Sequence, residues 1–364
     1  MRHWLRQVHL YTAMLCALIV SLVGLTGSIY VFEPELSGWL QQEYYQPKQA
    51  ITRFSSDQQL VRFIEQQTQG RIESLQWPVR SRKTYAFKLF DDEHWYFFDQ
   101  STGVISSDQG AYNHPALELV YRLHSNLMLG EPGRYVTATA SLLFALSSLL
   151  TGLYLWWPKS VRRLKQALSI SRSNPKRFNF DLHASAGVWF SIPLLIMAFT
   201  GAYFLYTAPM QKVIDVLMWS DAAPKDSWIT QHSLPPVDAP ALSVEQVVSR
   251  MQQLNPGLQP RNLWMTQKPK GVLSLGYQQS TEIEAGGQYR VFLQLHPQSG
   301  ELLSSYDPAT LPRASAFMAQ WLIPLHFGEF GGWFSRILWC IGGLIPLLLS
   351  ITGARIWLAR KRLW

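Results

Sequence analysis

The chain has 364 residues, of which 48% are hydrophobic and 15% are charged, and its formal net charge at pH 7 is +8. Soluble globular domains usually carry about 25% charged residues, so this composition argues against a protein that is soluble over its whole length. The hydrophobic residues are gathered in long blocks without Asp, Glu, Lys or Arg, which is typical of membrane-spanning segments. The four blocks are residues 10–32, 135–157, 184–211 and 337–354.

The first block contains 23 uncharged residues, and about 20 such residues span the hydrocarbon of a bilayer. It is longer than the roughly 7–15 apolar residues of a signal peptide, and no A-x-A cleavage site follows it, so we expect it to remain as an anchor. The other blocks contain 23, 28 and 18 residues. We therefore predict four transmembrane helices, in which Pro193 and Pro346 could kink the third and the fourth without clearly breaking them.

Short segments rich in Lys and Arg precede the first span, separate the second from the third, and follow the fourth. Such segments stay on the cytoplasmic side, and four spans allow all three to share it. We therefore predict that both termini and the loop 158–181 are cytoplasmic, and that the net charge reflects this bias rather than nucleic-acid binding. The basic residues are Arg2, Arg6, Lys159, Arg162, Arg163, Lys165, Arg172, Lys176, Arg177, Arg360, Lys361 and Arg362.

The two long connections, 34–133 and 208–320, then lie outside the cytoplasm. Each contains one stretch with apolar residues at helical spacing, 55–70 in the first and 243–257 in the second. Strand-like segments separated by turns follow each helix. They are 71–78, 84–90 and 94–107, then 258–265, 271–277 and 288–305. We expect two small external α+β domains, each with its own antiparallel sheet.

The spans repeat. Residues 9–27 and 183–201 have the same length, begin with His and end with Thr-Gly, and His124 and His326 precede Thr151 and Thr352 by 27 and 26 residues. We therefore expect two parallel copies of one unit made of a span, an external domain and a span. The predicted segments are 1–33 (N-terminus and first span), 34–133 (first external domain), 134–157 (second span), 158–181 (basic loop), 182–207 (third span), 208–320 (second external domain), 321–358 (re-entrant or interfacial segment and fourth span) and 359–364 (cytoplasmic tail).

Four histidines begin the predicted spans. Topology places His9 and His183 near the cytoplasmic face and His124 and His326 near the outer face, so each face has one histidine from each copy. Neutral imidazole is an axial ligand of haem iron, and ionisable residues at membrane depth are functional candidates. The pattern predicts two haem b groups, with iron bound by His9 and His183 in one and by His124 and His326 in the other. The alternatives are a single haem, or no haem, in which case each histidine only caps a helix or reaches the membrane interface.

Two further sets of residues accompany the histidines. Thr-Gly recurs at residues 26, 151, 200 and 352; its simplest role is close helix packing, and contact with a cofactor is the alternative. Basic residues near the two histidine pairs could bind haem propionates. These candidates are Arg6 and Arg177 on the inner side and Arg122, Arg134 and Arg336 on the outer side.

The two cysteines, Cys16 and Cys340, lie in the first and fourth spans and form no C-x-x-C motif. This argues against c-type haem attachment, iron–sulfur ligation and a structural zinc site, so we interpret both as apolar packing residues. The other histidines lack the placement at a span and are interpreted as surface or turn residues, with His114 within possible reach of the outer site. They are His3, His94, His114, His232 and His296.

Several motifs together resemble the PepSY-associated transmembrane family over nearly the whole chain. They are the Leu-Thr-Gly of the first span, the Leu-Trp-Trp-Pro closing the second, the Asp-Leu-His opening the third and the Thr-Gly-x-x-x-Trp-Leu of the fourth. Members of that family include iron-regulated inner-membrane proteins and haem-containing ferric-siderophore reductases. The resemblance implies a bacterial inner-membrane protein with PepSY-like periplasmic domains that acts as an oxidoreductase on a ferric siderophore or another ferric chelate.

The electron source would be a separate molecule. No G-x-G-x-x-G follows a strand, and the loop 158–181 is too short for a nicotinamide- or flavin-binding domain. Electrons would come from a reductase, a reduced flavin or a membrane quinol. Two other functions stay open: a permease for iron chelates, although no span has a charged residue at mid-membrane, and a PepSY regulator that binds peptides, which would leave the four histidines without a role.

Overall fold

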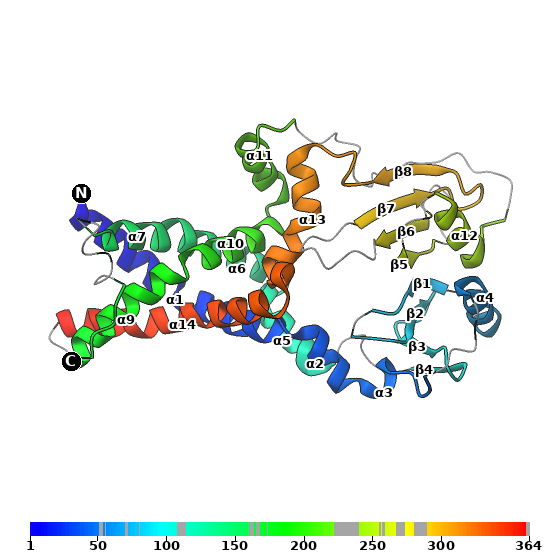
Figure 1. The fold of residues 1–364 in the computed structure, drawn as a ribbon, viewed down its shortest axis with the longest axis horizontal. Helices are drawn as coiled ribbons and strands as arrows, with labels where there is room; N and C mark the ends of the chain where they lie inside the picture. Colours follow the sequence, from blue (N-terminus) through cyan, green and yellow to red (C-terminus); the bar gives the residue numbers. More distant parts are fainter. Residues whose placement is uncertain are drawn as a thin grey trace. The chain divides into compact units, whose positions relative to one another are not determined.

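The computed structural model describes residues 1–50, 54, 56–69, 72–79, 81–107, 114–158, 160, 164, 168–172, 174–221, 240–254, 256, 259–266, 274–279 and 290–361. The chain divides into two compact units. The membrane unit consists of Met1–Glu33, Ala116–Gln211 and Leu322–Trp364, and the sheet unit of Pro34–Pro115 and Lys212–Trp321 (Figure 1). Some predicted features lie outside the described residues: Lys159, Arg162, Arg163, Lys165, His232 and Arg362.

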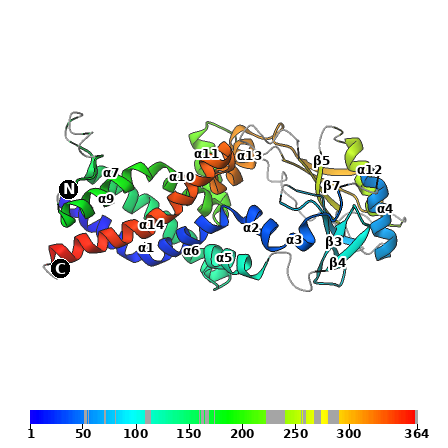
Figure 2. The same ribbon diagram turned by 60° about the horizontal axis from the view of Figure 1, so that its bottom comes forward.

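The long apolar helices lie side by side in the membrane unit (Figures 1 and 2). Three of them are long and apolar enough to cross a membrane, or four if a bent pair counts as one span. They are α1 (Arg2–Tyr30), the continuous run of α6 (Glu131–Leu143), the π-helix η1 (Phe144–Leu149) and α7 (Leu150–Trp156), the bent pair α9 (Pro175–Trp189) and α10 (Ser191–Tyr203), and α14 (Gly332–Arg360).

The third predicted span is broken, which corrects the expectation of a merely kinked helix. Helices α9 and α10 meet at Phe190 and are bent by 57°. Proline has no N–H to donate, and its ring crowds the carbonyl four residues earlier. For Pro193 that residue is Trp189, where α9 ends. By contrast, α14 runs through Pro346 as one helix.

A short helix before each of the second and fourth spans belongs partly or wholly to the membrane unit. Helix α5 (Pro115–Asn126) precedes α6, and α13 (Arg313–Phe327) precedes α14. The turn after α5 uses positive φ angles at Leu127, Met128 and Gly130, and Thr137 of α6 donates to the carbonyl of Ser125 at 2.9 Å. These contacts hold α5 against α6, and residues from Ala116 onward belong to the membrane unit.

Helices α1 and α14 approach each other closely because both are built from small residues at the contact. A Cβ atom added to Gly24 would lie 2.2 Å from the carbonyl oxygen of Gly343. The hydroxyl of Ser28 donates to the carbonyl of Cys340 at 2.8 Å, and the hydroxyls of Ser21 and Ser350 lie 3.1 Å apart. Buried residues around this contact form an apolar core: Cys16, Val20, Ala140, Phe144, Ala145, Leu149, Leu194, Ala198 and Ile345.

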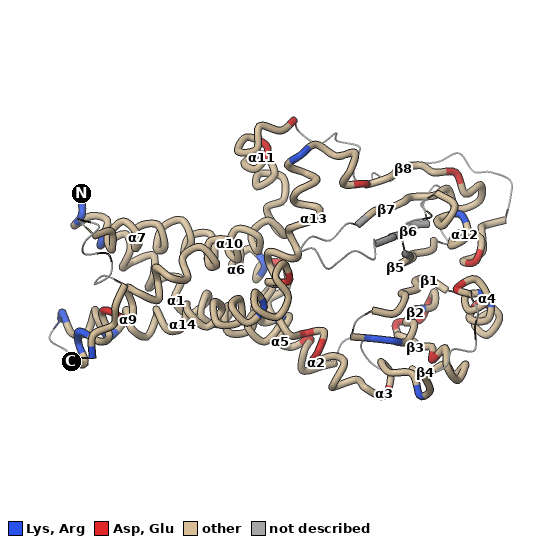
Figure 3. Tube along the Cα trace, in the orientation of Figure 1, with Lys and Arg blue, Asp and Glu red and all other residues tan. Residues whose placement is uncertain are grey.

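Basic residues mark one end of the membrane unit. Figure 3 shows Lys and Arg gathered at the end that holds the N-terminus, the C-terminus and the start of α9. The described members of this group include Arg2, Arg6, Lys176, Arg177 and Arg360. This is the distribution that the positive-inside rule associates with a cytoplasmic face.

The sheet unit contains one antiparallel sheet of eight strands in the order β4-β3-β2-β1-β5-β6-β7-β8. Helices α2 (Glu33–Leu40) and α3 (Gln42–Tyr45) lead into it, and α11 (Thr207–Leu217) follows α10. The strands are β1 (Ile72–Gln76), β2 (Tyr85–Leu89), β3 (Trp95–Asp99), β4 (Val104–Ser107), β5 (Gln259–Trp264), β6 (Ser274–Gln279), β7 (Arg290–Leu295) and β8 (Leu302–Tyr306).

The expectation of two separate sheets is therefore wrong. Strands β1 and β5 pair antiparallel, with Ser74 opposite Trp264 and Leu75 opposite Leu263. Each strand would otherwise be an edge with unpaired N–H and C=O groups. Pairing satisfies these groups and joins the two predicted domains into one unit.

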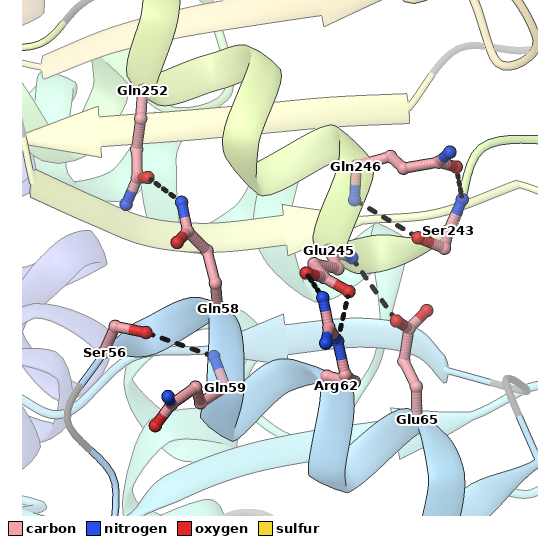
Figure 4. Close-up of polar contacts among 9 residues, drawn as sticks. All are labelled: Ser56, Gln58, Gln59, Arg62, Glu65, Ser243, Glu245, Gln246 and Gln252. Carbon is pink, nitrogen blue, oxygen red and sulfur yellow. Dashed lines mark hydrogen bonds and ion pairs between the residues drawn. The ribbon is translucent and has the colours of Figure 1, made fainter.

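The helices that accompany the two halves share one core, since α4 (Asp57–Thr68) packs against α12 (Val244–Leu254). Their apolar residues follow helical spacing and are buried together with residues of the sheet: Leu60, Val61 and Ile64 of α4, and Val244, Val247, Val248 and Met251 of α12. Figure 4 shows the polar contacts that border this core. Arg62 forms an ion pair with Glu245 at 2.6 Å, and Gln58 donates to Gln252 at 3.2 Å.

Glu65 of α4 caps the N-terminus of α12, since its carboxylate accepts from the backbone N–H groups of Val244 at 2.7 Å and Glu245 at 3.4 Å. Figure 4 shows the contact with Glu245. Burial raises the pKa of Glu65, while the two N–H donors partly oppose this shift. A carboxyl whose folded pKa is raised contributes stability that is present at low pH and is lost as pH rises through the folded pKa.

We expect Glu65→Ala to lower the free energy of unfolding by about 1 kcal/mol, the usual cost of losing a helix cap. Glu65→Gln keeps an acceptor oxygen without the buried charge, so its stability should match that of the wild type at low pH and exceed it at neutral pH, because the variant lacks the decline that ionisation of Glu65 causes. Chemical denaturation followed by circular dichroism between pH 4 and 8 measures both variants. Equal destabilisation by Ala and Gln would contradict the capping role.

Candidate functional site

The structure brings the four histidines together in two pairs, both within the membrane unit. The rings of His9 in α1 and His183 in α9 have centroids 6.3 Å apart and planes at 88°. The rings of His124 in α5 and His326 in α13 have centroids 6.1 Å apart and planes at 57°. Each pair contains one histidine from each half of the chain.

The histidines do not begin the spans, contrary to expectation. His124 and His326 lie near the ends of α5 and α13, and turns separate them from α6 and α14. Positive φ angles at Gly130 and Gly328 form these turns, a conformation that glycine adopts without strain. His9 lies in the third turn of α1, and His183 lies in the third turn of α9. All four histidines are half-buried.

Each histidine uses its Nδ1 atom to bind another span. Nδ1 of His183 bonds the hydroxyl of Thr352 at 2.9 Å, and Nδ1 of His326 bonds that of Thr200 at 3.0 Å. Nδ1 of His9 bonds the carbonyl of Ser148 at 2.9 Å and the hydroxyl of Thr151 at 3.2 Å. Ser148 lies within the π-helix η1, a geometry that often occurs at functional sites.

His124 differs from the other three, because among the described contacts its Nδ1 bonds no threonine hydroxyl and bonds only the backbone carbonyl of Val23, at 2.9 Å. The adjacent hydroxyl of Thr26 donates instead to the carbonyls of Leu22 at 2.7 Å and Val23 at 3.1 Å. Among the described contacts, Thr26 makes no hydrogen bond to His124.

The glycine after each of these threonines faces the imidazole ring. A Cβ atom added to Gly27 would lie 2.8 Å from Cε1 of His124. The corresponding distances are 3.2 Å from Gly152 to His9, 3.1 Å from Gly201 to His326 and 3.3 Å from Gly353 to His183. The Thr-Gly pairs therefore form four recesses for imidazole rings, a role beyond the helix packing that the sequence suggested.

The hydrogen bonds determine the tautomer of each histidine. A backbone carbonyl only accepts, and the hydroxyls of Thr200 and Thr352 already donate to carbonyls of their own helices at 2.7 Å. Nδ1 must therefore carry the proton. Within the described part of the chain no group bonds Nε2, which is left with a free lone pair. A neutral imidazole with Nδ1–H held by a second group is the usual form of a metal-ligating histidine.

The distances between the paired rings fit a metal between two imidazoles. A metal–imidazole nitrogen bond is about 2.0–2.1 Å, and Nε2 lies about 1.1 Å from the ring centroid because the ring bonds are about 1.3–1.4 Å. Two rings on opposite sides of one metal would thus have centroids roughly 6.3 Å apart. The pairs lie at 6.3 and 6.1 Å.

The number of side chains that converge as ligands indicates which metal-containing group the histidine pairs could hold. Among the described residues, no three or more His, Cys, Asp and Glu side chains converge as a metal site. Two imidazoles alone leave most coordination positions of a metal ion unfilled. A porphyrin supplies four of them and needs only two axial ligands, so the residues present fit haem better than a bare metal ion.

The five arginines that the sequence suggested for propionates fall into two groups. Arg134 pairs with Glu131 at 2.7 Å, and Arg177 pairs with Asp181 at 2.8 Å. Arg336 is buried, donates to the carbonyl of Val31 at 2.7 Å and lies 5.0 Å from the ring centres of Phe32 and Trp333. Only Arg6 and Arg122 are exposed and form no ion pair with a described residue.

A chain of aromatic rings, which the sequence did not indicate, leads away from the His124–His326 pair. His326 lies 5.5 Å from Phe327, Phe327 lies 6.2 Å from Tyr30, and Tyr30 lies 5.5 Å from Tyr121, as measured between ring centres. Tyr121 is 43% exposed. The chain thus connects the His124–His326 pair to an exposed side chain of the membrane unit.

These features define a multi-pass helical membrane protein with two half-buried histidine pairs. The family model described as the PepSY-associated TM region matches residues 6–360, so the chain belongs to that family. Comparison with curated proteins gives no match.

Proposed function

We propose that the protein is an inner-membrane electron-transfer protein with two haem b groups, which passes electrons to a ferric siderophore or another ferric chelate on the periplasmic side. The observation that carries this proposal is the spacing of the two histidine pairs, 6.3 and 6.1 Å between ring centres. The free Nε2 atoms of His9, His183, His124 and His326 would bind the two irons.

The proposed topology has four spans from two parallel repeats, with both termini in the cytoplasm. The basic residues at the end of the membrane unit that holds both termini support this orientation (Figure 3). His9 and His183 would then serve the cytoplasmic side, and His124 and His326 the periplasmic side. The Ser148 and Thr352 acceptors keep Nδ1 protonated on the first pair, and Val23 and Thr200 do so on the second.

Haem would supply the reversible one-electron change of iron. The protein residues supply the rest: paired imidazoles whose Nε2 atoms are free to bind, apolar helices that exclude water, and the aromatic chain that ends at Tyr121. A separate reductase, reduced flavin or quinol would donate one electron for each ferric ion reduced to Fe(II). Such reduction weakens an oxygen-rich chelate and would release the iron during iron uptake.

The test is a reduced-minus-oxidised absorption spectrum of the purified protein, with haem counted per chain. We expect two b-type haems per chain, and reduction of a ferric chelate with a stoichiometry of one electron per iron when the reduced protein is mixed with it. A colourless protein, expressed with ample haem, would contradict the proposal. A protein that binds haem but does not reduce the ferric chelate would still support a role in electron transfer, and it would exclude a ferric chelate as the electron acceptor.

The bend of 57° between α9 and α10 favours a second candidate, a permease for iron chelates, because many transporters use broken helices at their binding sites. Against it, α10 and the adjoining part of α9 contain no charged residue. Uptake of a labelled ferric chelate into proteoliposomes without any reductant would support the permease, whereas dependence on electron supply would support the reductase.

A further inference from the structure

The same arrangement of Thr, Gly and His occurs four times in the membrane unit. In each case a histidine from one helix enters the recess formed by a Thr-Gly pair on another: His9 at Gly152, His124 at Gly27, His183 at Gly353 and His326 at Gly201. Each recess lies within one half of the chain, whereas each histidine pair combines both halves. The recesses therefore orient single rings, and the pairs arise when the two halves pack together.

The threonine hydroxyl is a strong acceptor in three of the four recesses. The hydroxyls of Thr200 and Thr352 donate to the carbonyl four residues earlier at 2.7 Å, and that of Thr151 donates to the carbonyl of Ser147. A hydroxyl that already donates accepts more strongly, because chained hydrogen bonds polarise one another. Its oxygen then accepts the Nδ1–H of His326, His183 or His9.

We propose that Thr200, Thr352 and Thr151 are positioning residues that tune the histidines as haem ligands, and that Thr26 is not. This inference rests on the proposed haem function. An acceptor on Nδ1–H raises the basicity of Nε2, and a more basic axial ligand stabilises ferric iron more than ferrous iron. Loss of the hydroxyl should therefore raise the reduction potential of the haem that the ring binds.

The shift in reduction potential that follows loss of the threonine hydroxyl should differ among the four recesses. His326 and His183 each bond a threonine hydroxyl through Nδ1, so the loss of that hydroxyl should have the largest effect. His9 keeps the carbonyl of Ser148 at 2.9 Å, so Thr151→Val should have a smaller effect. His124 depends on the carbonyl of Val23 alone, so Thr26→Val should have none.

The decisive comparison is Thr200→Val against Thr26→Val, because both act on the His124–His326 pair. Spectroelectrochemical titration of the purified full-length protein resolves the potential of each haem. We expect Thr200→Val to raise one of the two potentials by about 59 mV, which corresponds to a tenfold change in relative affinity for a one-electron couple. Thr26→Val should leave both potentials at their wild-type values, and Thr200→Ser, which keeps the hydroxyl, should restore the wild-type potential.

Unchanged potentials in Thr200→Val, or equal shifts in Thr200→Val and Thr26→Val, would overturn the positioning role while leaving the haem function intact. A Thr200→Ser variant that shifts as far as Thr200→Val would also overturn it, because the cause would then be packing. A wild-type protein without haem would overturn both this inference and the proposed function, so the two failures are distinguishable.

Discussion

Replacing Gly24 by alanine is expected to destabilise the membrane unit strongly, because it forces apart the helices α1 and α14. The added Cβ would lie 2.2 Å from the carbonyl oxygen of Gly343 and 3.3 Å from its carbonyl carbon. Both atoms belong to the backbone of α14, so no side-chain rotation can relieve the clash. The two helices must separate, which forfeits their packing and the hydrogen bond from Ser28 to Cys340.

Gly24→Ala should lower the free energy of unfolding by roughly 1–3 kcal/mol or more, as overpacking does in protein cores. The higher helix propensity of alanine, about 1 kcal/mol relative to glycine, offsets only part of this loss. Separation would also move α1, which carries His9, relative to α14, which carries Thr352 and Gly353. We therefore expect a lower thermal midpoint in detergent, accompanied by loss of any bound cofactor. Fluorescence-detected size-exclusion chromatography after heating measures the thermal midpoint, and absorption spectroscopy measures the bound cofactor.

Gly187→Ala is the matched control. Gly187 also lies in a helix of the membrane unit, and its added Cβ would meet only Cδ2 of Leu349, at 3.7 Å. This is ordinary van der Waals contact, so the gain in helix propensity should prevail and stability should stay level or rise. If Gly24→Ala were as stable as Gly187→Ala, α1 and α14 could not be in backbone contact.

The sequence predicts best those features that depend on local pattern. Uninterrupted apolar blocks predict the long helices, because hydrophobicity over about 20 residues is itself the physical requirement. The helical spacing of Leu60, Val61 and Ile64 predicts α4, and that of Val244, Val247 and Met251 predicts α12. The family follows from motifs spread along the chain and is shown by the match to residues 6–360.

The features that the sequence misses depend on contacts between distant residues. Nothing near Leu75 indicates that its neighbour is Leu263, because strand pairing across the two halves is decided by which edges remain unpaired. The break at Phe190 was expected only as a kink, because the effect of Pro193 depends on how the surrounding helices satisfy the freed carbonyl.

The recesses for the histidines could be predicted from the sequence only in part. The equal spacing of His and Thr-Gly in residues 9–27 and 183–201 is visible in the sequence. The spacing does not show which threonine each histidine contacts, whereas the structure joins His9 to Thr151 and His183 to Thr352 on the following span of the same half. Sequence spacing therefore identifies the participants but not their partners.

The second prediction of large effect concerns which histidines act together. If His9 and His183 bind one haem and His124 and His326 bind the other, each single His→Ala variant should contain one haem per chain instead of two. The double variant His9→Ala/His183→Ala should also contain one, because its second substitution removes a ligand from a site that is already empty. This non-additivity is the usual signature of residues that act as a unit.

A double variant that spans the pairs should behave differently. His9→Ala/His326→Ala removes one ligand from each pair, so it should contain no haem and should fail to pass electrons from an internal donor to an external ferric chelate in proteoliposomes. Haem content per chain, measured beside the protein concentration, separates the two double variants. His94→Ala, in the sheet unit, is the control, because His94 bonds Asp92 on an exposed turn and should leave both haems in place.

The alternative pairing of the histidines predicts the opposite haem contents for the double variants. If the histidines within one half, His9 and His124, shared a haem, then His9→Ala/His124→Ala would retain one haem and His9→Ala/His183→Ala would retain none. The ring centres at 6.3 and 6.1 Å favour the pairs that cross between the halves. In that arrangement neither repeat can hold a haem alone, so the duplication of the unit and its two binding sites would depend on each other.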